Sequence, residues 1–130
     1  MPKSHLNPDS LFTNPAFSQG VKVTEPSATI YVGGQNGVDA EGQIVEGGLY
    51  EQSLQAYRNL EAVLAEGGAA LTDVVHWRIS VVDGQDVMDG VRAYQEVWTT
   101  EAEPPAITVQ VVAGHARPGV LCEIEALAVT

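Results

Sequence analysis

The stretch VVHWRISVVD, residues 74–83, constrains the fold more than any other part of this sequence. Apolar and polar side chains alternate along it, and a period of two predicts a β-strand. One face carries Val75, Trp77, Ile79 and Val81, and the other carries Val74, His76, Arg78 and Ser80. The apolar face needs a covering layer. The polar face needs either water or a partner subunit.

Helical patterns flank this strand on both sides. In residues 49–66, apolar side chains recur at spacings of three and four: Leu54, Tyr57, Leu60 and Leu64. This spacing predicts a helix with one apolar face, ended by Gly67 and Gly68. Residues 86–98 predict a second helix, in which Gly90 costs about 1 kcal/mol of helix stability.

The remaining β-rich runs complete the order strand, strand, helix, strand, helix, strand, strand; they are residues 21–23, 28–32, 107–113 and 120–129. We expect the first two runs to form a hairpin through the turn at residues 25–27. The order predicts an α+β fold with two helices on one face of a single mixed sheet.

Length and charge limit the organisation and the partners. A chain of 130 residues suits one core, so we expect a single domain spanning residues 1–130. Seventeen acidic residues against six basic ones give a net charge of -11, which repels nucleic acid and anionic membranes at long range. We therefore expect neither as a partner, and ribonuclease activity is disfavoured. The first residues lack a signal-peptide core and no run of about 18 apolar residues occurs, so a cytoplasmic location is expected.

Neither metal nor thiol chemistry is predicted. Cys122 is the single cysteine, which excludes an intrachain disulfide, and its place on an apolar strand face predicts a buried, inert thiol. His5, His76 and His115 lie far apart, without acidic residues at metal-ligand spacing. We expect no metal and no cofactor.

Six separated segments carry a resemblance to a known family: FSQGV at 17–21, YVGGQ at 31–35, NLEAVLAEGGAALTDVV at 59–75, VRAYQEVW at 91–98, PPA at 104–106 and EIEALAV at 123–129. With them the sequence resembles the reactive-intermediate deaminase (Rid) family, also called the YjgF or L-PSP family. The resemblance implies a chorismate-mutase-like α+β protomer, assembled as a homotrimer with small pockets at the subunit interfaces. The best known members hydrolyse enamines and imines to a keto acid and ammonia.

The chain departs from the family at several pocket positions. The arginine that binds the substrate carboxylate is replaced by Ile107, a tyrosine by Phe17, a serine by Gly33, and an asparagine falls on or near Val91. Of the chemically active positions only Glu123 matches. Loss of the arginine predicts a decrease of about ten- to a hundredfold or more in affinity for a small carboxylate.

Glu123 is the candidate catalytic residue. Strand alternation places it with Glu125 on the face opposite Cys122 and Ile124. Most glutamates are surface residues, so a solvated or interface carboxylate is the alternative. The resemblance favours a general base that directs water or moves a proton.

The other candidate residues are substrate-binding. Ile107 and Val109 are equally consistent with core packing and with an apolar pocket wall. Arg78 is expected either to pair across a subunit interface or to replace the missing anion anchor, and Arg117 is a second, looser candidate anchor. Gly33 and Gly34 are expected to let a ligand approach the backbone closely.

These observations lead to two functional hypotheses. The first is a divergent Rid-type enzyme that hydrolyses or rearranges a small imine, enamine or related carbonyl compound, with Glu123 directing water or a proton. The second is a trimer that binds a small ligand without turnover or serves as a structural or regulatory partner. Replacement of Glu123 by glutamine distinguishes them, because only an enzyme would lose its function.

Overall fold

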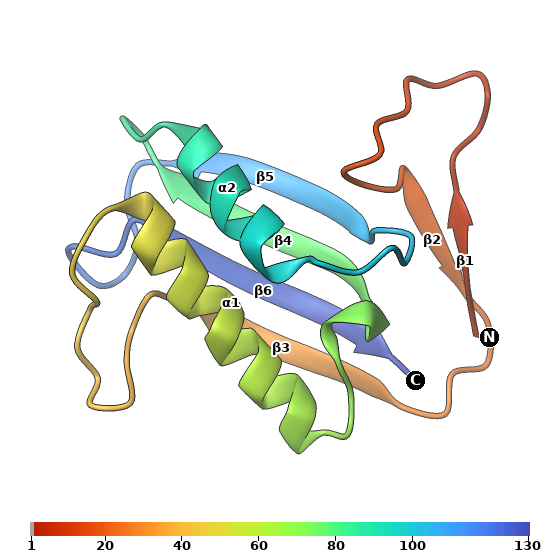
Figure 1. Cartoon of the computed structure of the whole chain (residues 1–130), viewed down its shortest axis with the longest axis horizontal. Coiled ribbons are helices and arrows are strands. Elements are labelled where there is room, and N and C mark those ends of the chain that lie inside the picture. The colour runs from red at the N-terminus through yellow and green to blue at the C-terminus, as the bar shows by residue number, and fades with distance from the viewer. Residues whose placement is uncertain (1) are drawn as a thin grey trace.

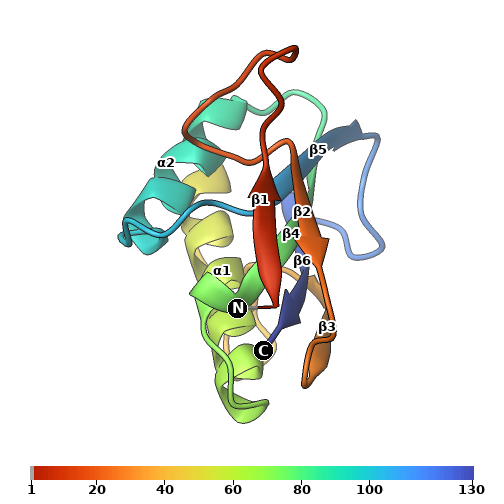
Figure 2. The same ribbon diagram turned by 90° about the vertical axis from the view of Figure 1, so that its right-hand side faces the viewer.

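The computed structural model describes residues 2–130, which form two layers (Figure 1). The elements in chain order are β1 (Lys3–Leu6), β2 (Gly20–Val23), β3 (Thr29–Gln35), α1 (Leu49–Glu66), the 3-10 turn η1 (Leu71–Asp73), β4 (Val74–Val82), α2 (Val87–Val97), β5 (Ala106–Val112) and β6 (Cys122–Val129). Both α-helices cover one face of the main sheet, and the other face is left open (Figure 2). The expected α+β class, with two helices on one face of a mixed sheet, is confirmed.

The main sheet has four strands in the order β3-β6-β4-β5. β4 and β5 run parallel, and the other neighbours are antiparallel. A parallel pair needs a crossover connection, which α2 supplies. The register aligns Ser80 with Gln110 on one side and with Glu123 on the other, so these three residues form one row across the sheet.

The expected hairpin between residues 21–23 and 28–32 is wrong. β2 pairs with β1, which lies in the polar N-terminal segment where no strand was expected, and β3 pairs with β6 instead. The connection between β2 and β3 is held by the C-terminus: the Ser27 N–H donates to the Thr130 carbonyl, and the Thr130 N–H donates to the Ala28 carbonyl. β1 and β2 thus form a separate two-stranded sheet, beside one end of the main sheet (Figure 1).

The core lies between α1 and the sheet. Tyr57, Leu60 and Leu64 of the predicted stripe are buried there, whereas Leu54 is half-buried. The Tyr57 and Trp77 rings meet edge to face, with centroids 5.4 Å apart. Such an aromatic pair contributes about 0.5–1.5 kcal/mol beyond its buried area.

Val74 also lies in this core, and its expected place on the polar face of β4 is wrong. The pairing of β4 with β6 shifts register between Val74 and His76, so Val74 and Val75 are both buried. An irregularity of this kind interrupts the alternation of side chains along a strand. From residue 76 onward the expected alternation holds.

Candidate functional site

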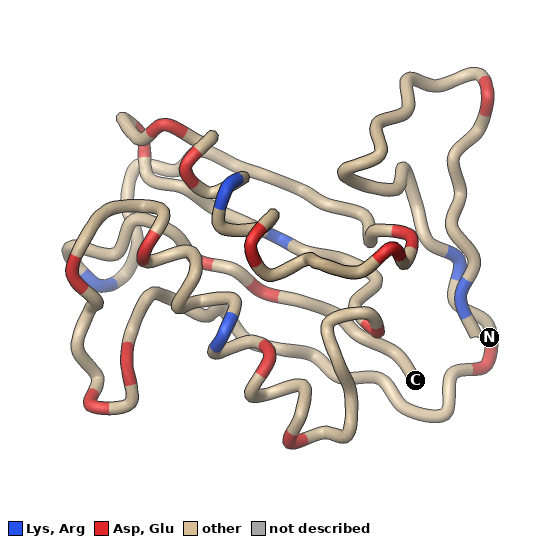
Figure 3. Tube along the Cα trace, viewed as in Figure 1, with Lys and Arg blue, Asp and Glu red and all other residues tan. Residues whose placement is uncertain are grey.

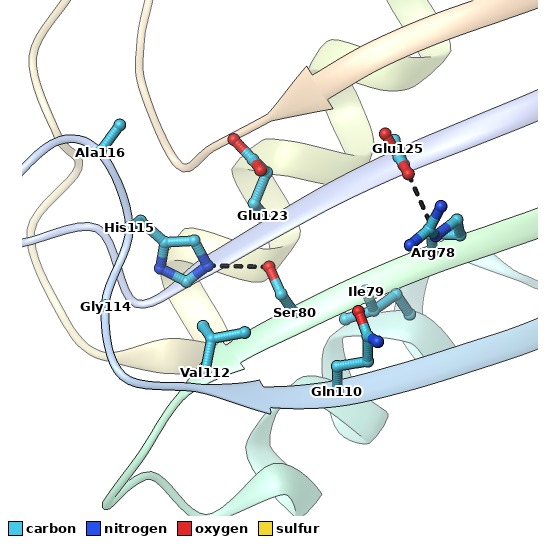
Figure 4. A pocket seen from close by; sticks show the side chains of 10 residues that line it. All are labelled: Arg78, Ile79, Ser80, Gln110, Val112, Gly114, His115, Ala116, Glu123 and Glu125. Atoms are coloured by element: carbon cyan, nitrogen blue, oxygen red, sulfur yellow. Dashed lines mark hydrogen bonds and ion pairs between the residues drawn. The ribbon is translucent and has the colours of Figure 1, made fainter.

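A polar pocket of about 340 Å³ lies on the open face of the sheet (Figure 4). Three strands and one loop supply its polar side chains, which are Arg78 and Ser80 from β4, Gln110 from β5, Glu123 and Glu125 from β6 and His115 from the loop between β5 and β6. The face that the sequence predicted to be polar therefore forms the wall of a pocket. Polar groups that converge in a concave site are typical of small-molecule binding.

The Ser80 hydroxyl and the His115 ring form a hydrogen-bonded pair in this pocket. Ser80 Oγ lies 2.8 Å from His115 Nε2, and His115 Nδ1 lies 3.1 Å from the Val120 carbonyl oxygen. A carbonyl oxygen only accepts, so Nδ1 carries the proton. In the neutral imidazole Nε2 is then bare, and the Ser80 hydroxyl donates to it.

Buried Gln52 of α1 fixes the loop that carries His115. Its amide nitrogen donates to the Gly119 carbonyl at 3.0 Å, and its carbonyl oxygen accepts from the Leu121 N–H at 2.8 Å. These two hydrogen bonds hold the end of the loop, at Gly119 and Leu121, against helix α1. His115 is thus positioned from two sides, by Ser80 and by the Val120 carbonyl that follows Gly119.

Arg78 forms an ion pair within the pocket. Its Nε lies 3.2 Å from Glu125 Oε1, and both side chains are about half exposed, at 56% and 45%. An exposed pair of this kind contributes only about 0–1 kcal/mol to stability. The remaining guanidinium N–H groups of Arg78 are donors that a ligand anion can use.

Glu123 lies against the backbone of β3. A Cβ atom built on Gly34 would stand 2.6 Å from Glu123 Cδ, a separation that non-bonded atoms do not adopt. A Cβ atom built on Gly33, by contrast, would have no other atom of the described chain within 4 Å. Gly34 therefore permits the position of the Glu123 carboxylate, which is exposed on the open face.

The apolar candidates lie in a different pocket. Phe17, Val91, Ile107 and Val109 line a cavity of about 340 Å³ between α2 and the sheet, on the helical side. Strand alternation puts Ile107 and Val109 on the face opposite Glu123. Within one chain these residues do not share a pocket with Glu123, and a site that combines them needs two subunits. Ile107 packs on the core and also lines the cavity, so both interpretations of this residue hold.

The other candidates are divided between the two sides of Glu123. Gly33 borders a hollow next to the polar pocket, which it shares with Arg78. Arg117 is exposed and lines a hollow with Gly34 and Asn59 on the other side. Arg78 is therefore the candidate anion anchor that lies in the same pocket as Glu123.

Four polar residues of the pocket were not among the sequence candidates: Ser80, Gln110, His115 and Glu125. Strand alternation places Ser80 and Glu125 on the polar strand faces without a role in the site. Gln110 could have been found, because alternation on residues 107–113 places it opposite Ile107 and Val109. His115 carried no signal, since its place depends on a loop held by a residue of a distant helix. Cys122 is buried as expected, and burial raises the pKa of its thiol.

Two further findings concern the described residues 2–130. Within them, no group of three His, Cys, Asp or Glu side chains is arranged to hold a metal ion. No helix in this range has the length and apolar character needed to cross a membrane.

Tyr94 is one of the residues that line the apolar cavity. Its hydroxyl is buried and has no hydrogen-bond partner among residues 2–130. Burial raises the pKa of Tyr94 to about 12, because the phenolate would lose its hydration. The neutral phenol is therefore favoured in the folded chain. In the unfolded chain Tyr94 loses its proton near pH 10, whereas in the folded chain it keeps the proton up to about pH 12. The stability that the neutral phenol contributes is therefore fully present below about pH 10 and is lost as the pH rises toward 12.

We expect Tyr94→Phe to move the alkaline unfolding midpoint to higher pH. At neutral pH the variant should be as stable as the wild type or more stable, since an unpaired buried hydroxyl costs about 1–3 kcal/mol. Unfolding followed by circular dichroism from neutral to strongly alkaline pH measures both effects. Tyr50→Phe is the control, because Tyr50 is only partly buried and does not line this cavity. An unchanged midpoint in Tyr94→Phe would contradict this expectation.

A mixed sheet with helices on one face and a polar pocket on the other defines a small α+β domain with a candidate small-molecule site. The chain belongs to the endoribonuclease L-PSP family, also known as the Rid or YjgF family, whose family model matches residues 9–130. It is similar to a RutC family protein of Pyrococcus abyssi, with 35% identity over 86% of this chain and 84% of the relative. It is also similar to the 2-iminobutanoate/2-iminopropanoate deaminase of Rattus norvegicus, with 36% identity over 88% of this chain and 80% of that protein.

A solved structure supports the same fold. The Rid family protein YyfB of Yersinia pestis, described as a protein of unknown function, superposes with a TM-score of 0.89 at 30% identity and covers 100% of both chains. The family identification made from the six sequence segments is confirmed.

Proposed function

We propose that this chain hydrolyses a small imine or enamine in the polar pocket, with Glu123 directing water. The observation that carries the proposal is the convergence of Glu123 and Arg78 in one pocket of about 340 Å³. The deaminase names of several relatives support imine chemistry at the level of the family.

The reaction needs a base next to an electrophilic carbon. Glu123 accepts a proton from water as the oxygen adds to the carbon of the C=N bond, and the nitrogen gains a proton. The tetrahedral intermediate then loses ammonia, and a carbonyl product remains. An enamine enters the same route after protonation at carbon gives the imine.

In the family, a carboxylate-binding arginine occupies the position of Ile107. Arg78 is proposed to take over its role in this chain. Arg78 lines the same pocket as Glu123, whereas Ile107 lies on the opposite face of the sheet. The Arg78 guanidinium already donates its Nε–H to Glu125, so a ligand carboxylate would share this guanidinium with Glu125. This competition predicts weaker binding of carboxylates than a free arginine would give.

The open face of the sheet is proposed to be the interface of a homotrimer. It carries Tyr31, whose side chain is 81% exposed, beside half-buried Leu127. Packing of a second subunit on this face would cover both residues and bring the apolar pocket of one chain near the polar pocket of another. Sedimentation analysis should give a particle of three 13.8 kDa chains.

Ribonuclease activity is disfavoured despite the family's name. The lysines and arginines are scattered over the trace and do not gather on one face, while acidic residues outnumber them (Figure 3). A nucleic-acid groove needs clustered positive charge to replace the counterions of the phosphates.

The test is ammonia release from imines made fresh by an amino-acid oxidase acting on alanine, leucine or phenylalanine. We expect the wild type to accelerate release, and Arg78→Gln to raise KM by about ten- to a hundredfold with kcat less affected. Arg58→Gln, on the exposed face of α1, is the matched control. Absence of acceleration with every imine would refute the proposal.

The apolar cavity favours a second candidate function, which is binding of a small apolar ligand without turnover. Its lining of Phe17, Val91, Ile107 and Val109 is typical of such sites. A binder would retain its ligand affinity when Glu123 is replaced, because Glu123 does not line this cavity.

A further inference from the structure

We infer that Ser80 is a nucleophile, activated by His115, that accepts an acyl group from small esters in the polar pocket. This inference goes beyond imine hydrolysis, because it assigns a covalent reaction to two residues that the proposed mechanism does not require. Its basis is the geometry of the pair and of the groups around it.

The pair has the arrangement of an activated hydroxyl. A serine nucleophile requires a base within hydrogen-bond reach, and the base requires a third group that orients it. Ser80 Oγ and His115 Nε2 are 2.8 Å apart, and the Val120 carbonyl holds Nδ1 at 3.1 Å. The tautomer fixed by that carbonyl leaves Nε2 free to accept the Ser80 proton.

The surroundings favour the charge that this transfer creates. The register pairs Ser80 directly with Glu123, and both line the pocket with His115. When His115 takes the proton it becomes an imidazolium, and a carboxylate on the same pocket wall stabilises that cation. Figure 4 shows the Ser80 and His115 side chains turned toward one another, with Glu123 on the neighbouring strand.

The reaction balances with water as the co-substrate. Ser80 Oγ bonds to the acyl carbon while its proton passes to His115 Nε2, and the alcohol departs with a proton returned by His115. Water then attacks the acyl carbon, His115 takes a proton from the water, and Ser80 regains its hydrogen. The net change is an ester and water giving an acid and an alcohol.

Arg78 suggests which esters fit the pocket. It is two residues from Ser80 on the same strand face, a spacing of roughly 7 Å. Small acyl compounds with an anionic group at that distance from the reacting carbonyl would contact both residues. A neutral ester is nevertheless a sufficient probe of the nucleophile.

The test uses 4-nitrophenyl acetate and the intact chain. We expect stoichiometric release of nitrophenolate followed by slow turnover, with one acetyl group found on Ser80 by peptide mass spectrometry. Ser80→Ala should lose this label, and His115→Gln should slow acylation by about 10²- to 10⁴-fold. Circular dichroism of each variant checks that the fold is retained.

The chain contains a matched control on the same face of the sheet. His76 Nε2 lies 2.9 Å from Thr108 Oγ1, but this pair does not line the polar pocket. His76→Gln should leave Ser80 acylation as fast as in the wild type. Labelling of Thr108 or the lysines instead of Ser80, or equal labelling of Ser80 in His115→Gln, would overturn the inference. Ser80 acylation without imine turnover would refute only the proposed function, whereas imine turnover without acylation would refute only this inference.

Discussion

Glu123→Gln is expected to lower kcat/KM for imine hydrolysis by about 10²- to 10⁴-fold while the fold persists. The amide has nearly the same shape as the carboxylate but cannot accept the proton of the attacking water. Glu123 is exposed on the open face, where a substitution changes stability by only about 0.5 kcal/mol. The loss of activity would therefore report chemistry and not unfolding.

Glu125→Gln is the comparison that isolates this effect. Glu125 lies two residues away on the same strand and lines the same pocket, where it pairs with Arg78. Its replacement releases the guanidinium, so we expect a lower KM for carboxylate-bearing imines and a kcat within a few-fold of the wild type. Equal losses of kcat in both variants would mean that total pocket charge, and not Glu123 as a base, sets the rate.

Gly34→Ala is expected to reduce imine turnover by about ten- to a hundredfold, because a catalytic group moved by about 1 Å loses its alignment. The added methyl would stand 2.6 Å from Glu123 Cδ. The atoms it meets are the far end of a flexible side chain, so Glu123 would rotate away and the backbone would stay in place. Neither Gly33 nor Gly34 has a positive φ angle, so alanine adds no backbone strain at either position.

Gly33→Ala provides the matched control, since a Cβ there meets nothing within 4 Å in the described chain. Steady-state kinetics and thermal unfolding of the two variants should show one with impaired turnover and both with nearly wild-type stability. Equal activity of the two variants would show that the position of the Glu123 carboxylate does not limit the reaction. Unfolding of Gly34→Ala would show that the clash is relieved through the backbone.

Much of the site's polar half could be predicted from alternation. Arg78, Ser80, Glu123 and Glu125 were assigned to the face away from the helices, and they line one pocket there. Alternation states which side of a strand a residue occupies and does not state which strands are neighbours. For that reason the sequence could not show that Ser80 is paired with Glu123.

The expected hairpin shows the same limit for the fold. Residues 21–23 and 28–32 have strand-forming composition and a turn between them, which are local properties. In the structure β2 pairs with β1 and β3 pairs with β6, so neither strand forms its hydrogen bonds with the other. Local propensity predicts that a strand forms, but the competition among possible partners is settled only in the assembled sheet.

The sequence by itself determined the family, the helices and strands of the main sheet, and the polar face of β4 from residue 76 onward, because these depend on side-chain periodicity and on residues at fixed spacing. The tertiary structure alone decided that Glu123 and Ile107 lie on opposite faces within one chain, and that His115 reaches Ser80. The reason is physical. His115 lies on a loop whose course is set by the hydrogen bonds of Gln52, a residue more than sixty positions away. No local pattern records a contact of that kind.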